Sequence, residues 1–316
     1  MLPGQNKMSA DENLAITATS VARLSLLTCA AMLAFAGNSI LCRLALMNDH
    51  IDPFSFTVLR LVSGALVLYV LVRLKLASTL QSTPIRPSVL ARHSGSWAGA
   101  VALFLYAITF SLAYVNMESG VGALILFGTV QLTMLLYGVF KGERLTPLSM
   151  SGLLLSLVGL VYLLLPGSSA PPLGSAFLMT VAGAAWGWYS VLGKGTSDPL
   201  AATADNFIRA IPFGLLAIVP FFASLKWDGL GVLCAVLSGA FASGLGYAVW
   251  YAVIKQLSVL KASSVQLCVP ILTALIGTAF LGEVLTLRIV LACIAVLGGI
   301  TLVLVSKRMK IASSYE

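Results

Sequence analysis

The sequence has few charged residues and few groups suited to acid–base or metal chemistry. Only 9% of its 316 residues are charged, and it holds 2 histidines and 5 cysteines. All five cysteines fall within apolar runs, at spacings that fit neither a disulfide framework nor a metal site, so we interpret them as packing residues. The chain also lacks a G-x-x-x-x-G-K-[ST] loop, so we expect no ATP hydrolysis.

Apolar runs of membrane-spanning length take the place of charge. Apolar residues make up 59% of the chain and the mean hydropathy is +0.99, whereas a soluble protein is about half apolar and about a quarter charged. A helix needs about 20 apolar residues to cross about 30 Å of hydrocarbon. The runs are 24–42, 54–72, 95–117, 119–140, two within 145–193 that the turn residues at 166–174 divide, 206–225, 229–254, 262–282 and 289–306. We therefore predict an all-α integral membrane protein with ten transmembrane helices.

The positions of lysine and arginine predict the orientation of these helices. With the N-terminus in the cytoplasm, 14 of the 19 basic residues fall on the cytoplasmic side, 3 fall outside and 2 lie within helices. This positive-inside bias also accounts for the net charge of +8 without a nucleic-acid partner. We predict cytoplasmic tails at 1–20 and 307–316, in a multi-pass protein of the bacterial inner membrane.

The chain repeats itself in reverse orientation. FKGERLT at 140–146 and FLGEVLT at 280–286 share five identical residues, and LRLVSGALVL at 59–68 aligns with IRAIPFGLLA at 208–217. We predict two five-helix repeats, at 21–166 and 173–306. Because five is odd, the second repeat enters the membrane from the other side, and inverted repeats of this kind are typical of secondary transporters.

The two glycine–glutamate junctions link the fourth and fifth helices of each repeat. We expect Gly142, Glu143, Gly282 and Glu283 to have structural roles at opposite membrane faces. The glutamates are expected to complement the positive N-terminal ends of the helices that follow them.

The pattern of these features resembles that of a known superfamily. The chain resembles the drug/metabolite transporter superfamily, and in particular its EamA-type ten-helix exporters. The shared pattern is a glycine-containing first helix, an arginine early in the second helix and an F-x-G-E-x-L-T junction, each of them repeated. The run 265–270 is similar to the proline-containing start of the ninth helix, although Val130 replaces that proline in the first repeat. The resemblance implies export of small metabolites, and the chain is most similar to YddG-type exporters of aromatic amino acids.

Two arginines lie inside predicted helices, and each allows two interpretations. Arg60 and Arg209 sit at equivalent depths of the two repeats. Placing an ionisable side chain inside a membrane has a high free-energy cost, so either arginine is a candidate for binding a substrate carboxylate. Alternatively, both bind backbone carbonyls or extend to the interface, which would be a structural role duplicated with the repeat.

Aromatic and uncharged polar residues supply the other candidates for a substrate cavity near the midplane. The aromatic candidates are Tyr106, Trp186, Tyr189 and Tyr247, and the polar ones are Asn38, Gln131, Gln266 and Thr273. An interfacial aromatic belt is the alternative for the ring side chains near helix ends, namely Trp97, Trp250 and Tyr251. The polar groups could instead join helices. Pro212, Pro220 and Pro270 interrupt predicted helices and are hinge candidates.

The expected mechanism follows from which groups the spans lack. Both histidines, His50 and His93, lie in predicted loops, and no acidic residue lies deep in a predicted span. We therefore expect no proton relay, cofactor or metal, and a neutral, zwitterionic or weakly anionic solute moved by facilitated diffusion or exchange. An amino acid exporter, aromatic or neutral, is the leading hypothesis. A carrier of purines, nucleotide sugars or organic anions is the alternative. A membrane enzyme acting on lipid is the least favoured hypothesis, because it would need a buried nucleophile with a base or a metal site, and the spans offer no histidine or carboxylate for either. The oligomeric state is left open, and a monomer would suffice.

Overall fold

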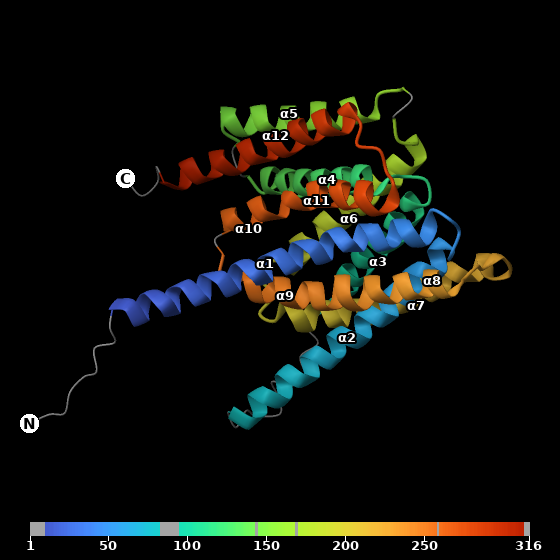
Figure 1. The fold of residues 1–316 in the computed structure, drawn as a ribbon, viewed down its shortest axis with the longest axis horizontal. Helices are drawn as coiled ribbons and strands as arrows, with labels where there is room; N and C mark the ends of the chain where they lie inside the picture. Colours follow the sequence, from blue (N-terminus) through green and yellow to red (C-terminus); the bar gives the residue numbers. More distant parts are fainter. Residues whose placement is uncertain (1–9, 83–94, 143–144, 168–169, 258, 313–316) are drawn as a thin grey trace, which may run out of the picture.

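The computed structural model describes all residues except 1–9, 83–94, 143–144, 168–169, 258 and 313–316 (Figure 1). Ten of its helical segments are long and apolar enough to span a membrane, and the described residues form helices with a single isolated bridge between Ile51 and Trp227. The prediction of an all-α membrane protein with ten spans is confirmed.

The first repeat holds α1 (Ala10–Leu46), α2 (Pro53–Ser82), α3 (Trp97–Tyr114), α4 (Ser119–Phe140) and α5 (Pro147–Leu164). The second holds α6 (Leu173–Gly193), α7 (Pro199–Ile218) with the 3₁₀ turn η2 (Val219–Ser224), the eighth span, the ninth span, and α12 (Leu287–Ala312). The eighth span runs through α8 (Gly229–Leu237), the π-helical η3 (Ser238–Leu245) and α9 (Gly246–Ile254), and the ninth consists of α10 (Val259–Gln266) and α11 (Cys268–Leu281).

Helix starts follow local capping chemistry. Thr146 accepts a hydrogen bond from the Ser149 amide and precedes Pro147, which fixes the start of α5. Asp198 caps α7 in the same way, with its carboxylate accepting from the Ala201 amide. The predicted start of the seventh helix at 206 is therefore wrong. The cap at Asp198 starts the helix at Pro199, so the polar residues before 206 are helical as well.

The repeated junction is a stop and start signal for helices. Gly142 and Gly282 have φ angles of +92° and +68°, a left-handed conformation that glycine adopts without strain and that ends α4 and α11. Thr146 and its equivalent Thr286 then cap the next helices, with the Thr286 hydroxyl accepting from the Ile289 amide at 3.3 Å. The identical residues of the two motifs therefore perform the same local task. Glu143 lies outside the described residues.

Contacts between the two repeats come in matched pairs, as an inverted duplication requires. α1 contacts α9 and α11, and the equivalent helix α6 contacts α3 and α4. α2 contacts α7, α4 contacts α11, and α5 contacts α12, each pair joining equivalent helices (Figure 1). The two five-helix repeats are thus interleaved around a shared centre, and the predicted inverted architecture is confirmed.

The prolines differ in their effects on the backbone. α7 continues through Pro212, so this proline does not interrupt the helix as predicted. Pro220 lies at the start of η2, where the helix tightens, and Pro270 lies just after the break between α10 and α11 at Leu267. By contrast, α4 is continuous through Val130, the equivalent region of the first repeat. A hinge role for the prolines stays a prediction.

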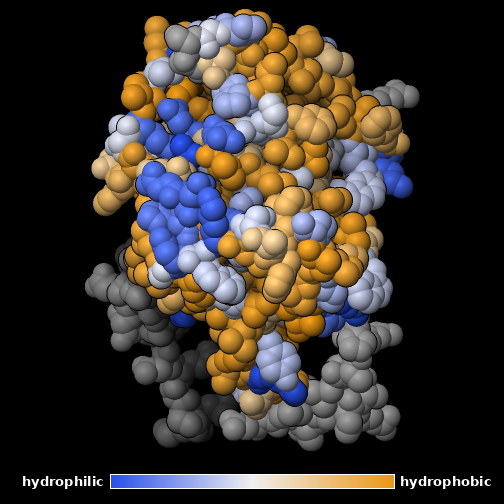
Figure 2. Space-filling view, turned by 90° about the vertical axis from the view of Figure 1, so that its right-hand side faces the viewer, coloured by the Kyte–Doolittle hydropathy of each residue, from blue (hydrophilic) through white to orange (hydrophobic). Residues whose placement is uncertain are grey.

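The two ends of the bundle are distinct. α1 begins and α12 ends at the same end, on the left in Figure 1, and the connections 47–52 and 225–228 lie at the opposite end, which we call the far end. Figure 2 faces the far end and shows hydrophilic residues gathered on an otherwise largely hydrophobic surface. Here the His50 ring nitrogen lies 2.6 Å from the Asp228 carboxylate, so a loop of one repeat is bound to a loop of the other.

Candidate functional site

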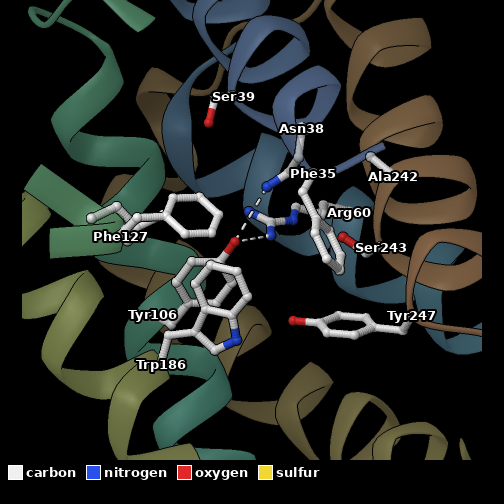
Figure 3. Close-up of a pocket in the computed structure, with 11 residues that line it drawn as sticks. Phe35, Asn38, Ser39, Arg60, Tyr106, Phe127, Trp186, Ala242, Ser243 and Tyr247 are labelled. Atoms are coloured by element: carbon white, nitrogen blue, oxygen red, sulfur yellow. Dashed lines mark hydrogen bonds between the residues drawn. The ribbon is translucent and has the colours of Figure 1, made fainter. Parts of the chain in front are cut away.

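A small cavity lies among the helices of both repeats, where the inverted halves meet (Figure 3). Its walls come from α1, α2, α3, α4, α6, η3 and α9. The residues that line it are Phe35, Asn38, Ser39, Arg60, Tyr106, Leu126, Phe127, Trp186, Ala242, Ser243 and Tyr247. The cavity measures about 10 Å³, which is room for about one water molecule. A larger solute therefore requires the helices around it to separate.

Arg60 is the charged residue at the centre of this lining. Its side chain projects from the second turn of α2 and only 2% of the residue is exposed. One guanidinium nitrogen, Nη2, donates a hydrogen bond of 2.7 Å to the Tyr106 hydroxyl, and the guanidinium carbon lies 5.0 Å from the centre of the Phe110 ring. A cation placed against aromatic rings is partly stabilised, but not neutralised.

Asn38 completes a polar network around Tyr106. Its amide nitrogen donates to the Tyr106 hydroxyl at 3.2 Å, and its amide oxygen accepts from the Ser238 hydroxyl at 2.7 Å. The network joins α1, α2 and α3 of the first repeat to η3 of the second. The network holds the Arg60 side chain in one orientation, because its hydrogen-bond partner, the Tyr106 hydroxyl, is fixed by Asn38.

The second guanidinium nitrogen of Arg60 has no partner. Nη1 is buried without a hydrogen bond, and within the described part of the chain no carboxylate lies within the 4 Å of an ion pair with Arg60. Removing a charge from water without a counter-ion costs several kcal/mol. A charge kept in this condition inside a membrane indicates a function.

Aromatic rings surround the polar centre. The Tyr106 and Trp186 rings stack with centroids 5.2 Å apart, and Phe35 meets Tyr247 edge to face at 6.0 Å. The Phe127 and Trp186 rings meet edge to face, with centroids 5.4 Å apart. Figure 3 shows these rings around one space, with the Tyr247 hydroxyl pointing into it. Such a lining suits a solute with a flat apolar body and a polar group at one end.

The π-helical segment η3 shapes the wall opposite Trp186. A side chain on Gly239 would collide with the Arg60 carbonyl and the Ser63 hydroxyl, so glycine allows η3 to approach α2 directly. π-Helical turns widen a helix by one residue and are frequent at functional sites. Here the widened turn presents Ala242 and Ser243 to the cavity.

Five of the predicted cavity residues meet here: Asn38, Arg60, Tyr106, Trp186 and Tyr247. The other five do not line this cavity: Gln131, Tyr189, Arg209, Gln266 and Thr273. Gln131 and Gln266 are half-buried elsewhere, and the Thr273 hydroxyl donates to the Val269 carbonyl within its own helix. The Tyr189 hydroxyl instead donates to the Thr203 hydroxyl of α7 at 3.2 Å.

The two arginines differ, although their positions in the repeats are equivalent. Arg209 donates to the Gly95 carbonyl at 3.2 Å and lies 5.5 Å from the Trp97 ring. The interpretation that both bind backbone carbonyls therefore describes Arg209, whereas Arg60 donates its hydrogen bond to a side-chain hydroxyl, that of Tyr106. The belt interpretation of Trp250 is wrong, because this residue is 5% exposed and contacts Phe35.

Several lining residues were not among the sequence candidates. They are Phe35, Ser39, Leu126, Phe127, Ala242 and Ser243. Phe35 lies three residues before Asn38 and so shares its helix face, which is a usable signal. Nothing in the sequence distinguishes the other five from the many small and apolar residues of the spans.

A second polar cluster joins the helices at the far end. The Glu283 carboxylate accepts hydrogen bonds from the Ser119 amide at 2.8 Å and from the Ser119 hydroxyl at 2.5 Å. Arg43 lies 3.7 Å from the same carboxylate and donates to the carbonyls of Tyr114 and Val115. Glu283 therefore complements the N-terminus of α4, not that of α12 as predicted, because the connection from α11 folds over the other repeat.

Comparison with known proteins gives the family. The EamA-like transporter family matches the chain twice, over residues 23–165 and 173–305. The chain belongs to the EamA-like transporter family. Each match covers five spans, so the EamA family unit is the repeat itself. The protein is accordingly a membrane-embedded transporter of small metabolites.

Relatives of this EamA protein occur in bacteria and archaea. An uncharacterized protein of Pseudomonas aeruginosa is 54% identical over 282 residues, covering 89% of this chain and 94% of that one. An uncharacterized transporter of Archaeoglobus fulgidus is 29% identical, covering 65% and 75% of the two chains. A crystal structure with 20% identity superposes with a TM-score of 0.61, covering 90% of this chain and 99% of the other, which shows a shared fold.

Proposed function

We propose that this EamA protein is a secondary transporter that exports amino acids, aromatic or neutral, or related small metabolites by alternating access. The observation that carries the proposal is the central cavity, where Arg60 and Asn38 lie among the rings of Phe35, Trp186 and Tyr247. Amphipathic solutes with one polar end and a flat body match this lining.

Alternating access fits the closed state of the cavity. The structure has room for about one water where a solute would bind, and the far end is closed by contacts between the two repeats. Inverted repeats allow one half to open each side by equivalent motions. We place the far end at the periplasmic face and both termini in the cytoplasm, following the distribution of basic residues.

The proposed energetics are facilitated diffusion or exchange. The cavity lining contains neither a carboxylate nor a histidine among the described residues, and these are the groups that proton relays use. An imposed pH gradient alone should therefore not concentrate the solute.

Counterflow in proteoliposomes tests this function. Vesicles containing the purified protein are loaded with an unlabelled amino acid, and uptake of radiolabelled phenylalanine, tryptophan, leucine or glutamate is followed. We expect the aromatic and neutral amino acids to exchange and glutamate to be excluded. Exchange of a different metabolite, with no exchange of any amino acid, would overturn the solute class but leave the transporter assignment in place.

A further inference from the structure

The central cavity carries a charge asymmetry that goes beyond the proposed solute class. Its lining includes one cation, Arg60, and no described carboxylate. An amino acid has one charged group of each sign, so a site built for a zwitterion would offer a partner to both. This site offers a full charge only to the carboxylate.

The geometry leaves a donor free for that carboxylate. Arg60 uses Nη2 for the Tyr106 hydroxyl, and Nη1 is buried without a partner. Arginine binds carboxylates through parallel N–H donors, which are strong because both groups are charged. A carboxylate here would satisfy the orphan donor and neutralise the buried cation in one contact.

An ammonium group finds much weaker partners in the same space. The Asn38 amide oxygen already accepts from Ser238, and the Tyr106 hydroxyl oxygen already accepts from Arg60 and Asn38. What remains is the hydroxyl groups of Ser39, Ser243 and Tyr247 and the aromatic faces. Beside an uncompensated guanidinium, these neutral groups also have to offset like-charge repulsion.

From this asymmetry we infer that the cavity selects a monocarboxylate with a flat apolar body, and that the α-ammonium of an amino acid is dispensable for binding. The inference rests on the proposed function, since it assumes that solutes bind in this cavity. It extends the substrate class to aromatic carboxylic acids without an amine. Arg60 is then the residue that determines specificity.

A binding series on the full-length purified protein tests the inference. Displacement of radiolabelled phenylalanine is measured for phenylalanine, 3-phenylpropanoate, which lacks the amine, and 2-phenylethylamine, which lacks the carboxylate. Measuring binding rather than uptake removes passive permeation of the acid and the amine. We expect 3-phenylpropanoate to bind within about 3-fold of phenylalanine, and 2-phenylethylamine to bind at least about 30-fold more weakly.

Variants assign the effect to Arg60. R60M should abolish the preference for the acid over the amine. If R60M does not fold, R60K takes its place, and because it keeps a charge it should retain part of the preference. R209K is the matched control, because Arg209 occupies the equivalent position of the other repeat and binds a backbone carbonyl. It should leave the ratio unchanged.

Two results would overturn the inference. Displacement by the amine as effective as that by the acid would show that the ammonium is read, while amino acid exchange and the proposed function would stand. Failure of all three compounds to bind, together with exchange of an unrelated metabolite, would remove the proposed solute class and the inference with it.

Discussion

Replacing Glu283 by glutamine should open the far end more often. The carboxylate joins α1, the start of α4 and the connection after α11 through Arg43 and Ser119. Glutamine keeps the size and one acceptor oxygen but removes the charge that strengthens these contacts. Arg43, whose Nε lacks a hydrogen bond even in the wild type, then loses its ion-pair partner.

The magnitude follows from the contacts that are lost. Hydrogen bonds to charged groups contribute about 1.5–3 kcal/mol, and neutral ones about 0.5–1.5 kcal/mol. With the Glu283 side chain 10% exposed, the change from charged to neutral should cost the closed state roughly 1–2 kcal/mol. Since about 1.4 kcal/mol is a factor of ten, the open population should rise about 5- to 30-fold.

Cysteine accessibility measures this population. Ser39 lines the cavity and is 1% exposed, so S39C in a cysteine-free background reports on opening. The rate of modification by an impermeant thiol reagent, added from the periplasmic side of intact cells, where we propose that the far end lies, should rise about 5- to 30-fold in E283Q. E118Q is the control, because Glu118 lies beside Ser119 but makes no capping hydrogen bond. Equal rates in wild type, E283Q and E118Q would refute the reasoning.

Three further predictions concern stability, measured as thermal unfolding of the protein in detergent. Y106F should destabilise by about 1–3 kcal/mol, because Arg60 loses its hydrogen-bond acceptor; an unchanged unfolding temperature would contradict this. G299A should destabilise by about 1–3 kcal/mol, since its new methyl group meets the Gly152 carbonyl, whereas G298A, with open space, should not. The backbone amide of Gly231, and after it His50, lower the pKa of Asp228. The stability that the Asp228 carboxylate adds relative to D228N should therefore be fully present above about pH 3.9. It should be lost as the pH falls through the lowered pKa. A stability difference that grew in acid would contradict this prediction.

The number and order of the helices are predictable because both depend on local properties. Span length is fixed by the bilayer, and the repeated F-x-G-E-x-L-T motif ends and starts helices through its own glycine and threonine. The seventh helix shows the limit of hydropathy. Its first two turns carry Thr203 and Asp205, and only the cap at Asp198 shows that they are helical.

The cavity was predictable in part. Asn38, Arg60 and Tyr106 were found because polar groups deep in a span need a reason to be there. Gln131 meets the same criterion, yet it lies outside this cavity, because residue type does not reveal which face of a helix meets its neighbours. The π-helical turn of η3 adds to the problem, since it shifts the facing of every later residue in that span.

The sequence-based expectation for Glu283 is wrong for a related physical reason. A glutamate after a helix is close in sequence to the next helix, and local reasoning assigns it there. The chain instead places Glu283 over the N-terminus of α4, which is 164 residues away. Contacts between interleaved repeats are long-range, so no sequence window contains both partners.

Quenching of tryptophan fluorescence tests the central cavity most directly. Trp186 lines the cavity, while Trp188, two residues further on, is 45% exposed and does not. Titration of the purified protein with phenylalanine, excited at a wavelength that phenylalanine does not absorb, should give a saturable change in the wild type and in W188F that is lost in W186F. A change that persists in W186F and disappears in W188F would place the solute outside this cavity and contradict the account.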